Sequence, residues 1–154
     1  MDGDKEKERT VDARQLCTFF LDGLCFGVDV TRVQEVIRYQ DMTRVPLATA
    51  VVRGLINLRG QIVTAVDMRI RLGIAPAKSG ELPMNVVVRT DDGAVSLLVD
   101  DIGDVVEVDE SAFEGPPETM PARARELVRG VYKLNDRLLL LLDTERAVDL
   151  QGAA

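Results

Sequence analysis

The stretch of sequence that decides the fold is residues 54–67, which read GLINLRGQIVTAVD. Two short runs of aliphatic and β-branched residues, Leu55–Leu58 and Gln61–Val66, lie on either side of Arg59-Gly60. Glycine accepts the backbone angles of a tight turn, so this pattern predicts a β-hairpin. The aspartate that ends the stretch, Asp67, is placed to cap a short helix that follows.

The same arrangement occurs a second time, 76 positions later. Residues 130–143 read GVYKLNDRLLLLLD, and Asp143 falls where Asp67 falls in the first copy. Both copies are interpreted as strand, tight turn, strand, capping aspartate and short helix over Met68–Leu72 and Thr144–Val148. The repeat indicates two similar halves, each too small to bury a large core alone.

The hairpins that open the two halves are similar as well. Leu16–Leu21 and Leu24–Val30 are expected strands around Asp22-Gly23, a strong hairpin signal. We match Asp22-Gly23 to Asp92-Gly93 at an offset of 70, and Val28-Asp29 to Val99-Asp100 at an offset of 71.

Many short strands and almost no long helix predict a mainly β protein built from two small barrels that pack together. The polar residues 1–14 are expected to form a flexible tail. The domain is expected to cover residues 15–150, with approximate subdomains at 15–80 and 81–150. Whether the subdomains exchange strands is left open by the sequence. The boundary loop between them is Ala75–Pro83, whereas Glu114–Pro121 is expected to be a stiff surface loop.

Composition excludes several functional classes. The 154 residues contain no histidine, no tryptophan and two cysteines, which excludes a Ser-His-Asp triad and the usual zinc sites. A net charge of −7 makes nucleic acid an unfavourable partner. The chain has no apolar run long enough for a membrane helix and no signal peptide at its start, so we expect a cytoplasmic protein with reduced cysteines.

The sequence of residues 54–63, followed by Val66-Asp67-Met68-Arg69, resembles the CheW family of chemotaxis coupling proteins. The resemblance covers about residues 15–150, and its further matches are Val33-Gln34-Glu35-Val36-Ile37, Val45-Pro46, Leu98-Val99-Asp100-Asp101-Ile102 and Val105. It implies two SH3-like five-stranded barrels that share a hydrophobic interface. It also implies a non-enzymatic adaptor, without cofactor or metal, in a two-component signalling system.

The resemblance implies two partners for this adaptor. One is the cytoplasmic tip of a chemoreceptor (a methyl-accepting chemotaxis protein), and the other is the regulatory domain of the CheA histidine kinase. The protein is expected to be a monomer in isolation and a component of receptor arrays at the inner face of the membrane. The residues expected to bind receptor or kinase are Val33, Glu35, Val36, Ile37, Asn57, Arg59, Gly60, Val86 and Val99.

Each of these residues also has a purely structural interpretation. Arg59 can be a solvated turn residue, with Gly60 supplying the turn angles and Asn57 holding the loop by a side-chain hydrogen bond. The valines are also compatible with barrel core, and Glu35 with a solvated strand position. Turn formation and solubility explain the acidic clusters at Asp91-Asp92 and in residues 100–104.

Other functions stay open at this point. The chain could be a scaffold of the same family in a non-flagellar chemosensory pathway. A small β-barrel that binds nucleic acid and an enzyme that uses carboxylates are the more remote alternatives.

Overall fold

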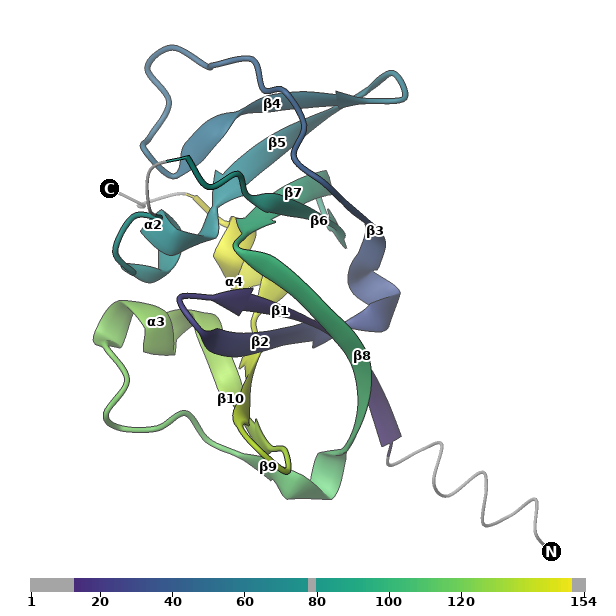
Figure 1. Cartoon of the computed structure of the whole chain (residues 1–154), viewed down its shortest axis with the longest axis vertical. Coiled ribbons are helices and arrows are strands. Elements are labelled where there is room, and N and C mark those ends of the chain that lie inside the picture. Colours follow the sequence, from purple (N-terminus) through teal and green to yellow (C-terminus); the bar gives the residue numbers. More distant parts are fainter. Residues whose placement is uncertain (1–12, 78–79, 151–154) are drawn as a thin grey trace, which may run out of the picture.

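The computed structural model describes residues 13–77 and 80–150 (Figure 1). Its strands are β1 (Ala13–Leu21), β2 (Leu24–Asp29), β3 (Val33–Ile37), β4 (Val52–Leu58), β5 (Gln61–Asp67), β6 (Met84–Thr90), β7 (Gly93–Val99), β8 (Asp101–Asp109), β9 (Phe113–Glu114), β10 (Val128–Lys133) and β11 (Leu138–Leu142). The short helices are η1 (Val30–Arg32), α2 (Met68–Leu72), η2 (Glu110–Ala112), α3 (Ala122–Leu127) and α4 (Thr144–Val148).

The strands form two mixed sheets, which confirms the prediction of a mainly β protein with short helices. Sheet A has the order β8-β1-β2-β11-β10-β9, and sheet B has the order β3-β6-β7-β5-β4. Neighbouring strands are antiparallel except for β2 with β11 and β5 with β7, which are parallel. Sheet B has the expected five strands and sheet A has six. Neither is closed by a continuous ladder among the described residues, so two SH3-like barrels remain a prediction.

Each sheet takes strands from both halves of the chain. The first hairpin, β1–β2, lies in sheet A beside β8 and β11, whereas the hairpin β6–β7 lies in sheet B beside β3 and β5. In Figure 1 the β4–β5 hairpin forms one end of the molecule, and β9 and β10 lie toward the other. Of the predicted tail, residues 1–12 lie outside the described residues, and Ala13 and Arg14 begin β1.

The structural repeat at offset 76 is confirmed by the strand register. In sheet B Gly54 pairs with Ala65, and in sheet A Gly130 pairs with Leu141. Both ladders shift register one residue before the glycine. A Cβ on Gly54 would lie 2.7 Å from the carbonyl oxygen of Thr43, and one on Gly130 would meet that of Glu114. Glycine at both positions therefore lets a third segment approach the bulge.

The offset predicted for the opening hairpins was wrong. Leu21 pairs with Leu24 across the first turn, and Thr90 pairs with Gly93 across the second, which gives an offset of 69. Asp22-Gly23 thus corresponds to Asp91-Asp92 and not to Asp92-Gly93. The offset of 69 also relates β3 to β8, because Val36 pairs with Val86 and Val105 pairs with Cys17.

The helix caps formed as the sequence predicts. The Asp67 side chain accepts a hydrogen bond from the backbone N–H of Ile70, and Asp143 accepts one from Arg146. These bonds satisfy N–H groups that a first helical turn leaves free. Gly73 ends α2 with a left-handed φ of 74°, as a C-cap glycine does.

The loop expected at residues 114–121 was only partly correct. Phe113 and Glu114 form the short strand β9, and α3 follows Pro121. No side chain caps α3, so the usual start signal is missing from the sequence. Between Pro46 and Val51 the chain makes turns and no helix.

Three clusters of buried side chains form the core. The shared core joins the two sheets and includes Phe19 and Phe26 from sheet A and Val86 and Val99 from sheet B. The sheet A cluster comprises Leu16, Cys25, Val108, Tyr132, Leu139 and Leu141. The sheet B cluster is smaller and comprises Ile56, Ala65 and Leu98.

Both cysteines are free thiols, and burial raises the pKa of each. No helix in residues 13–77 and 80–150 is long and apolar enough to cross a membrane. Within the same residues, no group of three or more acidic or cysteine side chains could hold a metal ion.

Candidate functional site

The turn between β4 and β5 presents Arg59 to solvent on a fixed backbone. Arg59 and Gly60 have φ angles of 54° and 85°, the positive values of a two-residue hairpin turn that follows sheet twist. The Asn57 side-chain oxygen accepts a hydrogen bond from the Gly60 N–H at 3.0 Å. The predicted turn roles of Asn57 and Gly60 are therefore confirmed. The Arg59 side chain is 84% exposed.

The structure brings Arg59 into contact with Glu35. A guanidinium nitrogen of Arg59 lies 3.4 Å from a Glu35 carboxylate oxygen, and the Glu35 side chain is 20% exposed. Glu35 is on β3, at the opposite edge of sheet B from β4 in the strand order. The contact shows that sheet B curls strongly, so that its first strand approaches its last hairpin.

The segment that leaves β3 follows the same curvature. Thr43 forms an isolated antiparallel bridge with Leu55, with two backbone hydrogen bonds of 2.8 Å. The chain therefore passes from the β3 edge of sheet B to the β4 edge within a few residues. This passage fixes where Glu35 stands relative to the Arg59 turn.

The remaining predicted residues of β3 divide between core and surface. Val33 is half-buried and packs against the shared core, and Ile37 is also half-buried. Val36 is 38% exposed. Since side chains alternate along a strand, Val36 is the apolar residue that β3 offers to a partner.

Val86 and Val99 are buried, although Val86 pairs with the exposed Val36 in the ladder between β3 and β6. Each is 1% exposed and belongs to the shared core. Both therefore contribute to packing between the sheets in this structure. Their expected contact with a receptor stays a prediction.

Sequence reasoning missed the exposure of two apolar residues, one beside the Arg59 turn and one on β8. Ile62 follows the Arg59 turn and is 60% exposed, and Val105 on β8 is 53% exposed. Val105 occupies in sheet A the place of Val36 in sheet B, and Asp104 occupies that of Glu35. The correct hairpin offset of 69 would have revealed this second acidic-aliphatic pair on an edge strand.

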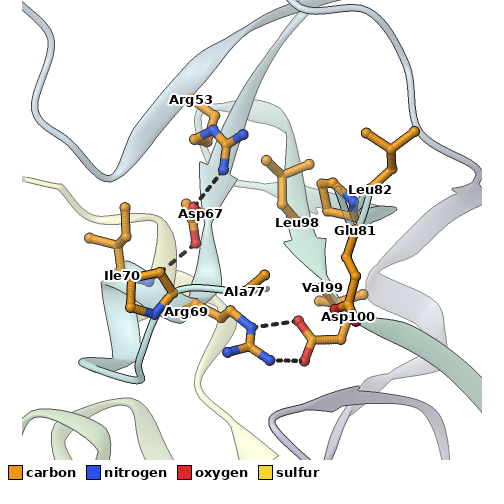
Figure 2. Close-up of a pocket in the computed structure, with 12 residues that line it drawn as sticks. Arg53, Asp67, Arg69, Ile70, Ala77, Glu81, Leu82, Leu98, Val99 and Asp100 are labelled. Carbon is orange, nitrogen blue, oxygen red and sulfur yellow. Dashed lines mark hydrogen bonds and ion pairs between the residues drawn. The ribbon is translucent and has the colours of Figure 1, made fainter. Parts of the chain in front are cut away.

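A cavity of about 320 Å³ beside α2 was a further candidate site (Figure 2). The Arg69 guanidinium donates to both carboxylate oxygens of Asp100, at 2.7 Å and 2.5 Å, and Arg53 donates to Asp67 at 3.0 Å. The hydrogen bonds from Arg69 hold the pKa of Asp100 below its usual value. Four of the charged residues that line the cavity are therefore paired with one another, Arg69 with Asp100 and Arg53 with Asp67.

Arg69 and Asp100 form one of two ion pairs whose carboxylate also accepts a hydrogen bond from the turn of a hairpin. The backbone N–H of Asp22 in the first turn donates to Asp100 at 2.8 Å. In the second turn the backbone N–H of Asp91 donates to the Glu145 carboxylate at 3.1 Å. The same carboxylate accepts a hydrogen bond from the Arg32 guanidinium at 2.9 Å. Corresponding turns are therefore held by charge pairs of the same kind.

Known proteins are similar to this chain in sequence and in fold. A family model described as a CheW-like domain matches residues 15–151. The chain is 30% identical over 139 residues to a chemotaxis protein CheW of Rhizobium meliloti, covering 90% of each protein. It is 29% identical over 136 residues to the chemotaxis protein CheW of Treponema pallidum, covering 86% of this chain and 80% of the relative.

A solved structure agrees with these relatives. The crystal structure of the scaffolding protein TtCheW from Thermoanaerobacter tengcongensis superposes with a TM-score of 0.80 at 26% identity. The alignment covers 90% of this chain and 94% of that one. Sequence and fold together place this chain in the CheW-like domain family of chemotaxis scaffold and coupling proteins.

Proposed function

We propose that this chain is a non-catalytic adaptor that binds the cytoplasmic tip of a chemoreceptor and the regulatory domain of the CheA kinase. The observation that carries the proposal is the exposed Arg59 on a rigid turn, beside Glu35 and the exposed Val36, in a CheW-like domain.

The chemistry of this surface suits the end of a helical hairpin. A guanidinium presents several N–H donors in a planar fork that matches carboxylate and carbonyl groups. Glu35 engages one edge of the Arg59 fork at 3.4 Å and leaves other donors facing solvent. Two exposed apolar side chains lie close in sequence to these charged residues: Val36 follows Glu35, and Ile62 follows the Arg59 turn. Such a surface combines a charge-assisted contact with packing.

Binding of the kinase would use a different part of the molecule. By family resemblance the regulatory domain of CheA has the same fold, so barrel-to-barrel contacts would allow adaptor and kinase to alternate in rings. A change in the receptor would then alter the active population of the kinase through a coupling free energy between the two interfaces.

The test is an NMR titration of isotopically labelled protein with a receptor-tip fragment and, separately, with the kinase regulatory domain. The variant Arg59→Ala is expected to weaken binding of the receptor fragment at least tenfold with unchanged thermal stability, because the side chain is exposed. Arg137→Ala is the matched control, since Arg137 is a partly exposed arginine beside the corresponding turn of sheet A.

Chemical-shift changes clustered on residues 33–37 and 57–62 would support the proposal. Equal affinity of the Arg59→Ala and Arg137→Ala proteins would contradict the role of Arg59. No binding of either partner at tens of micromolar would overturn the proposed function.

A further inference from the structure

A buried polar pair lies inside sheet B. Asn85 on β6 and Ser96 on β7 are both 0% exposed. The Ser96 hydroxyl donates to the Asn85 side-chain oxygen at 2.7 Å, and the Asn85 amide nitrogen donates to the backbone carbonyl of Arg38 at 3.1 Å. Ser96 therefore orients the amide so that its NH₂ group points toward Arg38.

The fold itself does not require this pair. At the offset of 69 the corresponding residues of sheet A are Leu16 and Gly27, in strands of the same order and register. Leu16 is 0% exposed and belongs to the sheet A cluster. Burial of an amide and a hydroxyl is unfavourable unless both are hydrogen-bonded, so a polar pair where its counterpart is apolar needs its own explanation.

The backbone carbonyl of Arg38, which accepts the Asn85 hydrogen bond, explains why a polar residue is buried here. The ladder between β3 and β6 ends at the pair Ile37–Asn85, and Arg38 is the next residue of the chain. Beyond Asn85, β6 offers only Met84 before Pro83, which has no backbone N–H to donate. In sheet A the equivalent ladder continues from the pair Leu16–Val106 to Ala13–Asp109. The Asn85 side chain thus anchors the chain where backbone pairing stops.

The anchored segment leads directly to the proposed receptor surface. Arg38 lies three residues after Glu35, and the segment that starts there runs to the Thr43 bridge with β4. The end of β3 is therefore held on one side by Asn85 and on the other by the Arg59–Glu35 contact. A shift of β3 would move Glu35 and Val36 relative to Arg59.

We propose that Asn85 and Ser96 are positioning residues, which set the place of β3 and thereby the geometry of the surface formed by Glu35, Val36 and Arg59. This inference rests on the proposed function for its effect on binding, but its structural part can be measured without any partner.

The chain provides a matched control in sheet A. The Thr18 hydroxyl, on a side chain buried to 5% exposure, donates to the backbone carbonyl of Asp104 at 2.5 Å. Thr18→Val removes this side-chain hydrogen bond to the edge strand β8, which also pairs with β1, and changes no residue that contacts Arg38. It therefore reports the general cost of losing a buried side-chain-to-carbonyl bond.

The principal variant is Asn85→Leu with Ser96→Gly, which reproduces the Leu16 and Gly27 pair of sheet A. Should this protein fold poorly, Ser96→Ala removes only the hydroxyl that orients the amide. Both proteins and Thr18→Val are compared with the unmodified chain by amide hydrogen exchange and by titration with the receptor-tip fragment. Thermal unfolding of each protein provides the scale for any change in global stability.

We expect faster exchange in Val33–Ile37 of the Asn85 and Ser96 variants, with unchanged exchange in β8, and the reverse in Thr18→Val. Affinity for the receptor fragment is expected to fall about fivefold to tenfold, the effect of losing one net hydrogen bond. Binding of the kinase regulatory domain is expected to change less.

Unchanged exchange in β3, or exchange raised equally throughout sheet B, would overturn the positioning role. Faster exchange in β3 with unaltered receptor affinity would show that the anchor does not serve the binding surface. If the unmodified chain fails to bind the fragment, the proposed function fails, whereas the exchange data still decide whether Asn85 positions β3.

Discussion

Sheet A and sheet B repeat one strand order and register, yet different side chains fill their corresponding positions. In sheet A the positions are occupied by Leu16, Tyr132, Leu139 and Leu141. At the same places sheet B has Asn85, Ile56, Val63 and Ala65, all buried. The backbone arrangement is thus compatible with a large apolar cluster and with a small cluster beside a polar anchor.

This difference indicates that sheet A contributes more to stability, whereas sheet B carries the residues of the proposed binding surface. Apolar burial stabilises by roughly 25 cal/mol per Å², so the larger side chains give the sheet A cluster the greater share of stability. Sheet B combines less apolar burial with the Asn85 anchor and the Arg59 turn. Four measurements test this difference between the sheets.

The largest effect is expected when sheet A is made to resemble sheet B. Leu141→Ala places at this position the alanine that sheet B has in Ala65, and should lower the free energy of unfolding by about 3 kcal/mol through lost burial and a cavity. Urea denaturation measures it. The reciprocal Ala65→Leu should destabilise by about 1 to 3 kcal/mol by overpacking. Stabilisation by Ala65→Leu would show that sheet B contains unfilled space.

The glycines at the two bulges test whether the sheets share the same backbone constraint. Gly54→Ala and Gly130→Ala should each cost about 2 kcal/mol, because the added Cβ meets a backbone carbonyl that must move. Gly115→Ala is the control, since no described atom lies within 4 Å of its Cβ. If thermal unfolding shows that either bulge variant is as stable as Gly115→Ala, the two sheets do not share this backbone constraint.

The capping aspartates should differ slightly. Asp143→Ala should cost about 1 kcal/mol, the usual value of a helix N-cap. Asp67→Ala should cost somewhat more, because the ion pair of Asp67 with Arg53, at 3.0 Å, is closer than the 3.8 Å contact of Asp143 with Arg146. Asp67→Asn, which retains the cap and removes the charge, separates the two contributions in chemical denaturation. Equal losses for both alanine variants would show that the closer ion pair with Arg53 adds nothing beyond the contact of Asp143 with Arg146.

The smallest effect concerns acid stability. Hydrogen bonds from Arg69 hold the pKa of Asp100 below its usual value, so ionised Asp100 favours the folded state. That contribution is complete above the ordinary carboxyl pKa of about 4 and is lost as pH falls through the depressed pKa. Asp100→Asn should therefore flatten the decline of stability between about pH 5 and pH 2.

The matched control is Asp101→Asn, which removes a neighbouring exposed carboxylate and retains the contact with Arg69. An Asp100→Asn profile parallel to that of the unmodified protein would show that the Arg69–Asp100 pair does not link stability to pH.

Local features of this fold were accessible from sequence. The Arg59-Gly60 turn, the Asp67 cap and the end of α2 at Gly73 each depend on a few neighbouring residues with a specific backbone requirement. The missed helix α3 lacks such a signal, because it follows a proline-rich loop without a capping side chain.

Partner choice among strands was not accessible in the same way. The apolar run after the Asp22-Gly23 turn predicts that β2 is a strand, but it does not predict that β2 pairs in parallel with β11. The residues of the candidate site show the same difference between local and long-range contacts. Asn57 and Gly60 were placed correctly because their contact is local, whereas the Arg59–Glu35 pair depends on the curl of sheet B.

The exchange of hairpins between the sheets has a consequence for biosynthesis. A ribosome releases β1 and β2 first, but their neighbours β8 and β11 are made much later, after sheet B has all its strands. Sheet B can therefore assemble while the first hairpin still has exposed edges, and sheet A can be completed only after Leu142 has been added. Long-range pairing of this kind slows folding and leaves strand edges open to other chains. The nascent protein is thus most vulnerable to misassembly through β1 and β2, the segment that waits longest.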